Sequence, residues 1–335
     1  MIAGAYLGCP NFKFTIWYFK FKLPDKLINL ILILEEYLVV ILVVLVNVAL
    51  LTLIERKILG LRQIRIGPNK VGSWGLLQPA ADAIKLFTNS LSILGPINKL
   101  VYFGSPALRL LLTLLFLTLI SPSVGGRHFC YRIVFFMILL RLNIYPLIGA
   151  GWGSGSKYAR LGGLRGIAQT ISYEIRLAFI CISLFSLWRR RRIRIKVFPT
   201  SSGGVFLLSV PVFFLWVITC IAELNRTPFD FAEGESELVS GFNVEYGSVK
   251  FAIIFIAEYG IIYFFSVLSI YLFSPLKLRS SRLIILGVIV IGRVIWVRTT
   301  LPRFRYDLLI NLTWKKVLPW RLRACQISAL VLFSF

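Results

Sequence analysis

The chain has 335 residues, of which 58% are hydrophobic and only 16% are charged. Soluble domains carry about 25% charged residues, so this composition indicates a protein whose main solvent is lipid and leaves little chain for a soluble domain. The formal net charge is +24. The basic residues are scattered through apolar segments and loops without a nucleic-acid-binding motif, which argues against a nucleic-acid-binding protein.

Cysteine and histidine are too sparse to predict a metal centre. None of the five cysteines forms a C-x-x-C pair, which argues against an iron–sulfur cluster or a zinc site. His128 is the single histidine, which excludes haem ligation by paired histidines. If the protein serves a redox reaction, we therefore expect the electrons to arrive on a cofactor of a partner.

The first 26 residues differ from the rest of the chain. They are mixed, aromatic and lysine-bearing, and they lack a small-residue cleavage site. Residues 1–26 are either a poorly ordered N-terminal extension or a targeting leader. We expect residues 27–335 to form a single helical membrane domain.

Apolar segments long enough to cross a bilayer recur along this domain, since a span needs roughly 20 apolar residues. The sequence predicts an all-α integral membrane protein with a bundle of about eight transmembrane helices. Seven candidates are strong, and Arg321 and Arg323 interrupt the eighth. The candidates are 28–54, 101–121, 133–151, 165–188, 205–223, 251–273, 283–298 and, as the eighth, 313–335.

The long loop 55–100 contains a segment with helical periodicity. Its apolar residues recur three and four positions apart, while Asp82 and Lys85 fall outside that stripe. Pro79 suits a first helical turn. The pattern predicts an amphipathic helix that lies in the membrane interface or packs against the bundle. The stripe consists of Leu77, Ala80, Ala81, Ile84, Phe87 and Leu91.

The segment 222–246 concentrates carboxylates between two candidate spans. It holds six of the chain's acidic residues against the single Arg226. Crowded carboxylates raise one another's pKa, so such a cluster can store or pass protons at a membrane mouth. A solvated acidic loop that keeps the end of a span in water explains the composition equally well. The acids are Glu223, Asp230, Glu233, Glu235, Glu237 and Glu245.

Two further carboxylates lie inside candidate spans. Glu174 is in the middle of 165–188, and Glu258 is in 251–273. An ionisable group at this depth costs at least a few kcal/mol and usually faces a polar pathway or a partner. The alternative is a neutral carboxyl group that is hydrogen-bonded to Tyr173, to Tyr259 or to a neighbouring span.

Several long motifs in a fixed order carry a resemblance to a known family. Over about residues 37–320 the chain resembles the quinone-chamber subunit of respiratory complex I, in particular its animal mitochondrial members. The motifs are Glu55-Arg-Lys-Ile-Leu-Gly60, Gly67-Pro-Asn-Lys-Val-Gly72, Gly75-Leu-Leu-Gln-Pro79 with Asp82, Leu164-Arg-Gly-Ile-Ala-Gln-Thr-Ile-Ser-Tyr-Glu174, the 222–246 segment, Ala257-Glu-Tyr259 and Leu301-Pro-Arg-Phe-Arg-Tyr-Asp307.

The resemblance implies a core subunit of proton-pumping NADH:ubiquinone oxidoreductase in the mitochondrial inner membrane. Such a subunit forms most of the ubiquinone tunnel and begins a polar path for proton coupling. It holds no redox centre, since NADH, FMN and the Fe–S clusters bind partner subunits in the soluble quinone module and beyond. Other partners are membrane-arm subunits and lipid. The implied chamber and path residues are Glu55, Arg56, Asp82, Arg165, Glu174, Glu223, Arg226, Asp230, Glu233, Glu235, Glu237 and Glu258.

The resemblance also implies a topology. It assigns the four stretches 55–100, 152–164, 223–250 and 299–312 to the matrix side. The predicted spans independently assign these four stretches to one face, because they alternate with the other loops.

Three features depart from the family pattern. Asn89-Ser90 stands where the family usually has Lys-Glu, so one acid of the implied path is missing. The arginine-rich run 189–194 falls on the intermembrane side of the implied topology, against the positive-inside rule. Arg141, Arg176 and Arg293 lie inside candidate spans, where each is costly.

One hypothesis explains the excess of arginine. The chain has 24 Arg but only 14 Lys and 2 Met. Invertebrate mitochondria read AGA and AGG as Ser and AUA as Met, so translation with the standard code would turn Ser into Arg and Met into Ile. Arg176 stands where the family commonly has Ser. The alternatives are drift in this lineage or a degenerate gene copy.

Two other classes of function compete with a complex I subunit. A stand-alone proton- or cation-coupled transporter would predict an internal repeat and broken helices, which the sequence does not show. A structural scaffold without a part in the chemistry leaves Glu174 and Glu258 unexplained.

Overall fold

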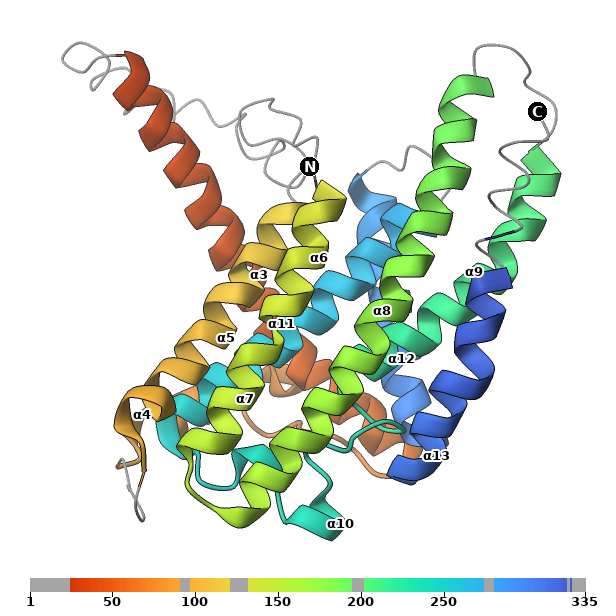
Figure 1. The fold of residues 1–335 in the computed structure, drawn as a ribbon. Helices are drawn as coiled ribbons and strands as arrows, with labels where there is room; N and C mark the ends of the chain where they lie inside the picture. Colours follow the sequence, from red (N-terminus) through yellow and green to blue (C-terminus); the bar gives the residue numbers. More distant parts are fainter. Residues whose placement is uncertain are drawn as a thin grey trace.

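The computed structural model describes residues 25–90, 97–120, 132–194, 202–273, 280–323 and 326. Within these ranges the chain forms helices and no strand (Figure 1), which confirms the predicted all-α class for the described part. The extension 1–24, His128 and most of the C-terminal half of the eighth candidate lie outside the described residues.

Long helices make up the body of the protein. Of the seven strong candidate segments, 133–151 is divided between two consecutive helices, and each of the other six falls in one helix over its described residues. A backbone in lipid must satisfy its own hydrogen bonds, and a helix does so. The helices are α3 (Asp25–Arg62), α5 (Lys99–Ile120), α6 (Arg132–Leu142), α7 (Ile144–Gly153), α8 (Lys157–Arg194), α9 (Ser202–Glu223), α11 (Ser248–Phe273) and α12 (Ser280–Thr300).

Shorter elements connect and flank the long helices. They are η1 (Ser73–Gly75), α4 (Gln78–Thr88), α10 (Glu235–Leu238), η2 (Gly241–Asn243), α13 (Tyr306–Asn311) and the π-helical turn η3 (Leu312–Val317). In Figure 1, α4 and α10 lie at the same end of the bundle.

Three segments are long and apolar enough to cross a membrane by themselves: Lys99–Leu119, Val134–Gly153 and Ser248–Phe273. The second combines α6 and α7, which continue one another across Asn143. Val212–Glu223 in α9 is apolar but shorter. The described residues therefore contain three candidate membrane-spanning helices, and they do not confirm the predicted number of about eight.

Helix α11 occupies the centre of the bundle and contacts α3, α5, α9 and α12 (Figure 1). Aromatic rings fill the space around it. Phe264 packs against Phe116 with ring centroids 5.0 Å apart, and Phe265 lies near the fully buried Trp216. In lipid, such close packing replaces the hydrophobic effect as the force that joins helices.

The predicted amphipathic helix is present as α4, with Pro79 in its first turn. The apolar side chains Ile84 and Phe87 and the preceding Leu77 are exposed on its surface. The helix contacts α3 and α11. The exposed apolar face of α4 is typical of a helix that lies in the membrane interface or against a partner protein.

The segment 224–247 folds closely onto α8 through glycines. Gly241 has a φ of +62°, and a Cβ there would lie 1.8 Å from the carbonyl oxygen of Ala232. On α8, a Cβ at Gly162 would lie 3.0 Å from the same oxygen, from Gly241 Cα and from Phe242 N. Glycine at position 241 therefore lets the acidic segment fold closely on itself, and glycine at position 162 lets that segment pack against α8.

Gly162→Ala should therefore destabilise the protein. Overpacking of this kind costs about 1–3 kcal/mol, and we expect a lower midpoint of thermal unfolding for the purified protein in mild detergent. Gly292→Ala in α12 is the matched control, because a Cβ at Gly292 meets no atom within 4 Å. Equal midpoints for the two variants would contradict the close contact between α8 and the segment 224–247.

Candidate functional site

A buried carboxylate between two arginines forms the centre of the site. Glu258 in α11 is only 7% exposed. Its Oε1 atom lies 3.2 Å from Arg109 Nη2, and its Oε2 atom lies 3.5 Å from Arg226 Nη2. Because an unpaired charge is very costly in an apolar interior, a carboxylate at this depth needs a guanidinium partner.

Aromatic faces enclose the two arginines. The guanidinium carbon of Arg226 lies 4.9 Å from the ring centroid of Tyr259, and that of Arg109 lies 5.2 Å from the ring centroid of Phe242. Both distances suit cation–π attraction, which strengthens when water is excluded. Helices α5 and α11 and the segment 224–247 thus meet at Glu258.

The acidic segment adds two carboxylates to this centre. Asp230 forms an ion pair with Arg303 at 3.4 Å and accepts a hydrogen bond of 3.2 Å from the backbone N–H of Glu233. Asn243 Nδ2 donates to Glu233 Oε1 at 3.1 Å. We call Arg109, Arg226, Asp230, Glu233, Glu258 and Arg303 the central ion cluster.

Protons bind more readily to this segment than to an ordinary loop. Burial raises the pKa of Glu233 well above its usual value of 4.5, the negative charge of Glu258 raises it further, and Arg226 opposes both effects. Burial also raises the pKa of Asp230, against the lowering effect of Arg303. The cluster therefore contains carboxyl groups that can take up and release protons as the charges around them change.

A second acidic pair lies between α8 and α9. Glu174 accepts a hydrogen bond of 2.8 Å from Arg141 Nε within an ion pair. Glu223, at the end of α9, is buried and close enough to Glu174 for electrostatic repulsion. Its Oε2 atom has no hydrogen-bond partner among the described residues. Glu174 thus pairs with an arginine and not with a tyrosine.

The other predicted residues form separate ion pairs. Arg56 donates to Asp82 at 2.6 Å on the surface beside α4. Glu55 is buried and pairs with Arg298, and Arg165 pairs with the exposed Glu237. Glu235 begins α10, and its side chain lies outside the described residues.

The twelve predicted residues are therefore distributed over several places. Arg226, Asp230, Glu233 and Glu258 lie together in the central ion cluster, and Glu174 and Glu223 are neighbours. Five of the remaining residues lie in ion pairs: Glu55 with Arg298, Arg56 with Asp82, and Arg165 with Glu237. The side chain of the sixth, Glu235, lies outside the described residues.

Sequence analysis missed three arginines of these networks. Arg109 lies inside the candidate span 101–121, and the same rule that selected Glu258 could have selected it. Arg298 and Arg303 are basic residues near a span end, which ordinarily indicates anchoring, so no signal marked them as partners of Glu55 and Asp230.

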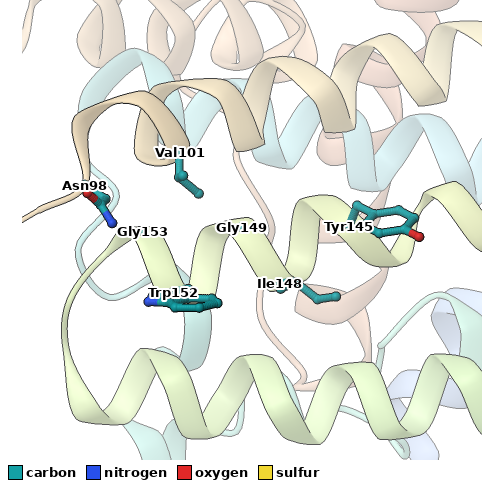
Figure 2. Close-up of a pocket in the computed structure, with 7 residues that line it drawn as sticks. All are labelled: Asn98, Val101, Tyr145, Ile148, Gly149, Trp152 and Gly153. Carbon is teal, nitrogen blue, oxygen red and sulfur yellow. The ribbon is translucent and has the colours of Figure 1, made fainter.

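A pocket of about 350 Å³ lies apart from the central ion cluster. Figure 2 shows it between the start of α5 and α7, with Val101, Tyr145 and Trp152 among its lining side chains. Its lining includes none of the predicted site residues. It is lined by Asn98, Val101, Tyr145, Ile148, Gly149, Trp152 and Gly153.

Fold and site together define an all-helical membrane protein with charged side chains paired inside an apolar bundle. Comparison with known proteins names the family. The NADH dehydrogenase family model matches residues 35–329, and the chain belongs to this family.

Curated relatives support the same assignment. The chain is 46% identical over 282 residues to NADH-ubiquinone oxidoreductase chain 1 of Anopheles gambiae. The aligned residues cover 84% of this chain and 90% of that protein. It is 46% identical over 285 residues to the protein of the same name of Aedes aegypti, covering 85% and 91%. For Strongylocentrotus purpuratus the identity is 42% over 299 residues, covering 86% and 92%. The resemblance stated from the motifs is thereby confirmed.

The raised pKa of Glu233 predicts a pH-dependent stability. A carboxyl group whose folded-state pKa is raised stabilises the fold below its usual pKa of 4.5, and this contribution is lost as the pH rises through the raised value. The thermal midpoint should therefore fall as the pH rises above about 5, and Glu233→Gln should flatten this dependence. The measurement is the midpoint of thermal unfolding between pH 5 and about 8.

Asp307→Asn serves as the control, because Asp307 lies in an exposed pair with Arg305. We expect this variant to keep the pH dependence of the unmodified protein. If Glu233→Gln also keeps it, Glu233 does not carry the buried proton.

Proposed function

We propose that the chain is a core membrane subunit of proton-pumping NADH:ubiquinone oxidoreductase. In this proposal it forms the tunnel for ubiquinone and the start of a polar path for protons. The relatives are named as chain 1 of this oxidoreductase. The observation that carries the mechanistic part is the central ion cluster, in which Glu258 is buried and paired with Arg226 beside the proton-binding Glu233.

The physical argument starts from the cost of charge in an apolar bundle. A charged group at span depth costs several kcal/mol and usually serves a polar path or a partner. Reduction of a quinone adds electrons and takes up protons, so the charge beside the tunnel changes during turnover. In a medium of low dielectric constant, such a change shifts the proton affinity of Glu233 and Asp230 through Glu258 and Arg226.

The path proposed from the resemblance extends beyond the cluster. Glu174 and Glu223 lie next to one another between α8 and α9 and provide a second place where a proton can be held. Outer pairs such as Arg56 with Asp82 and Arg165 with Glu237 lie at more exposed positions. The proposed chamber and path residues are Glu55, Arg56, Asp82, Arg165, Glu174, Glu223, Arg226, Asp230, Glu233, Glu235, Glu237 and Glu258.

The electron-transfer chemistry belongs to partners in this proposal. NADH, FMN and the Fe–S clusters bind other subunits, and ubiquinone is the substrate. The surface beside α4 supports contact with a soluble partner, because Ile64, Ile66 and Trp74 are 97%, 85% and 77% exposed. Contiguous exposed apolar side chains near basic residues are typical of an interaction surface.

The proposal places the protein in the mitochondrial inner membrane as a multi-pass domain over residues 27–335. The relatives are animal proteins, and the apolar helices suit a membrane. In this proposal the long helices form seven spans, and residues 313–335 form the eighth. The stretches 55–100, 152–164, 223–250 and 299–312 then face the matrix.

Removal of charge from the path should slow quinone-coupled turnover. In the assembled complex, Glu258→Gln, Glu174→Gln or Glu235→Gln should each reduce NADH:ubiquinone reductase activity by at least about 10-fold, because a group that transfers protons contributes that much or more. NADH oxidation with an artificial electron acceptor should persist, since the electron entry site is on a partner.

Glu35→Gln is the matched control, because Glu35 is an exposed carboxylate on α3 outside the proposed path. It should retain quinone-coupled activity. Loss of both activities in the path variants would indicate failed assembly, and unchanged quinone-coupled activity in all three would contradict the proposed path.

Solubilisation separates this function from that of a stand-alone transporter. In mild detergent the protein should migrate with NADH dehydrogenase activity as one large particle, because its exposed surface beside α4 is covered by partners. Native electrophoresis with an activity stain makes the measurement. Migration as a lone particle without that activity would refute the assignment to a complex.

A further inference from the structure

Three arginines are buried in the helix bundle with few partners. Arg176 is 0%, Arg321 is 2% and Arg109 is 6% exposed. Arginine is almost never fully buried unless it is paired. Among the described residues Arg176 and Arg321 form no ion pair, and hydrogen-bond acceptors are missing for three nitrogens of Arg176 and two of Arg321.

Arg176 and Arg321 also lie close enough to repel one another. The guanidinium carbon of Arg176 is 4.8 Å from the ring centroid of Tyr173 and 5.8 Å from that of Trp314. Aromatic faces offset part of the cost of a buried cation, but they accept no conventional hydrogen bond. Arg321 Nη2 donates to the carbonyl oxygen of Leu215 at 3.0 Å, which leaves its charge unneutralised.

A bound anion does not explain the buried cation of Arg321. The hollow beside Arg321 is lined mainly by apolar side chains, including Ile180, Val212 and Leu215, and it is too narrow to admit a water molecule. An anion such as phosphate is larger than water, so the packing leaves no place for a counterion there.

Arg109 is a surplus cation in the central ion cluster. Glu258 already has Arg226 as an ion-pair partner. Arg109 contacts Glu258 through Nη2 only, and its Nε and Nη1 atoms are buried without acceptors. A buried cation with two unsatisfied nitrogens costs more than a small neutral side chain at the same place.

A serine hydroxyl group fits all three positions, because in a helix it can donate to a carbonyl oxygen three or four residues earlier. Helix α8 already does this near Arg176: Ser172 donates to the carbonyl oxygen of Ala168 at 2.6 Å, and Ser183 donates to that of Ile180 at 2.8 Å. Such a hydroxyl needs neither a counterion nor a partner from another helix.

We infer that serine occupies positions 109, 176 and 321 in the protein made by the mitochondrion, because the codons there are AGA or AGG. Invertebrate mitochondria translate these codons as serine, and the chain is similar to mosquito and sea urchin proteins. The mitochondrial code of insects also translates AUA as methionine. Translation with the standard code would therefore raise the number of arginines and lower that of methionines, in a chain that has 24 Arg and 2 Met.

The inference changes the charge of the proposed proton path and in this respect rests on the proposed function. With serine at position 109, Arg226 is the one remaining ion-pair partner of Glu258 among the described residues. The central ion cluster loses one positive charge, so its carboxylates bind a proton more readily.

Peptide mass spectrometry of the complex purified from the animal's mitochondria tests the inference. Digestion with chymotrypsin yields peptides whose masses distinguish arginine from serine at each position. We expect serine at 109, 176 and 321, and arginine at the ion-paired positions Arg226, Arg298 and Arg303. Arginine at 176 or 321 would overturn the inference, and arginine at 109 would overturn its consequence for Glu258.

Sequencing of the mitochondrial gene provides a second measurement. The inference requires AGA or AGG at positions 109, 176 and 321, and CGN codons at the three ion-paired arginines. A CGN codon at 176 or 321 contradicts it. Neither measurement depends on quinone reductase activity, so a failure of this inference is distinguishable from a failure of the proposed function.

Discussion

The arrangement of this protein depends on the cost of placing charge inside an apolar bundle. Glu258 lies near the middle of α11, where lipid or apolar side chains would surround an unpaired carboxylate. Arg226 reaches it from the segment 224–247, so this segment must stay folded against the bundle. The ion pair therefore couples the position of a connecting segment to the charge state of a transmembrane helix.

The glycines of α8 and η2 make this coupling possible. Gly162 brings α8 within contact distance of the backbone of the segment 224–247, and Gly241 lets this segment fold closely against its own residue Ala232. Asp230 and Glu233 are consequently removed from water and bind protons more strongly than exposed carboxylates do. Close backbone packing thus produces a cluster of carboxyl groups whose proton affinity is raised by burial.

Residue patterns predicted the site in part. The crowding of acids in 222–246 and the isolated Glu258 marked four members of the central ion cluster, because charge inside apolar sequence is conspicuous. Arg303 remained unrecognised, since its partner Asp230 is 73 residues away and no local pattern connects them. Glu55 and Arg56 are adjacent in sequence but point to different partners, Arg298 and Asp82, because neighbouring residues on a helix face different directions.

The sequence alone determined that the described chain is helical, that it suits a membrane and that it belongs to the NADH dehydrogenase family. The length of the apolar segments and the order of the motifs are properties of the sequence, and neither depends on the tertiary structure. Only the tertiary structure decided which charges meet and which are left over: Glu258 pairs with Arg226, whereas Arg176 and Arg321 face no carboxylate among the described residues. Pairing depends on distances between helices that are far apart along the chain, and the energy of a buried charge depends on those distances.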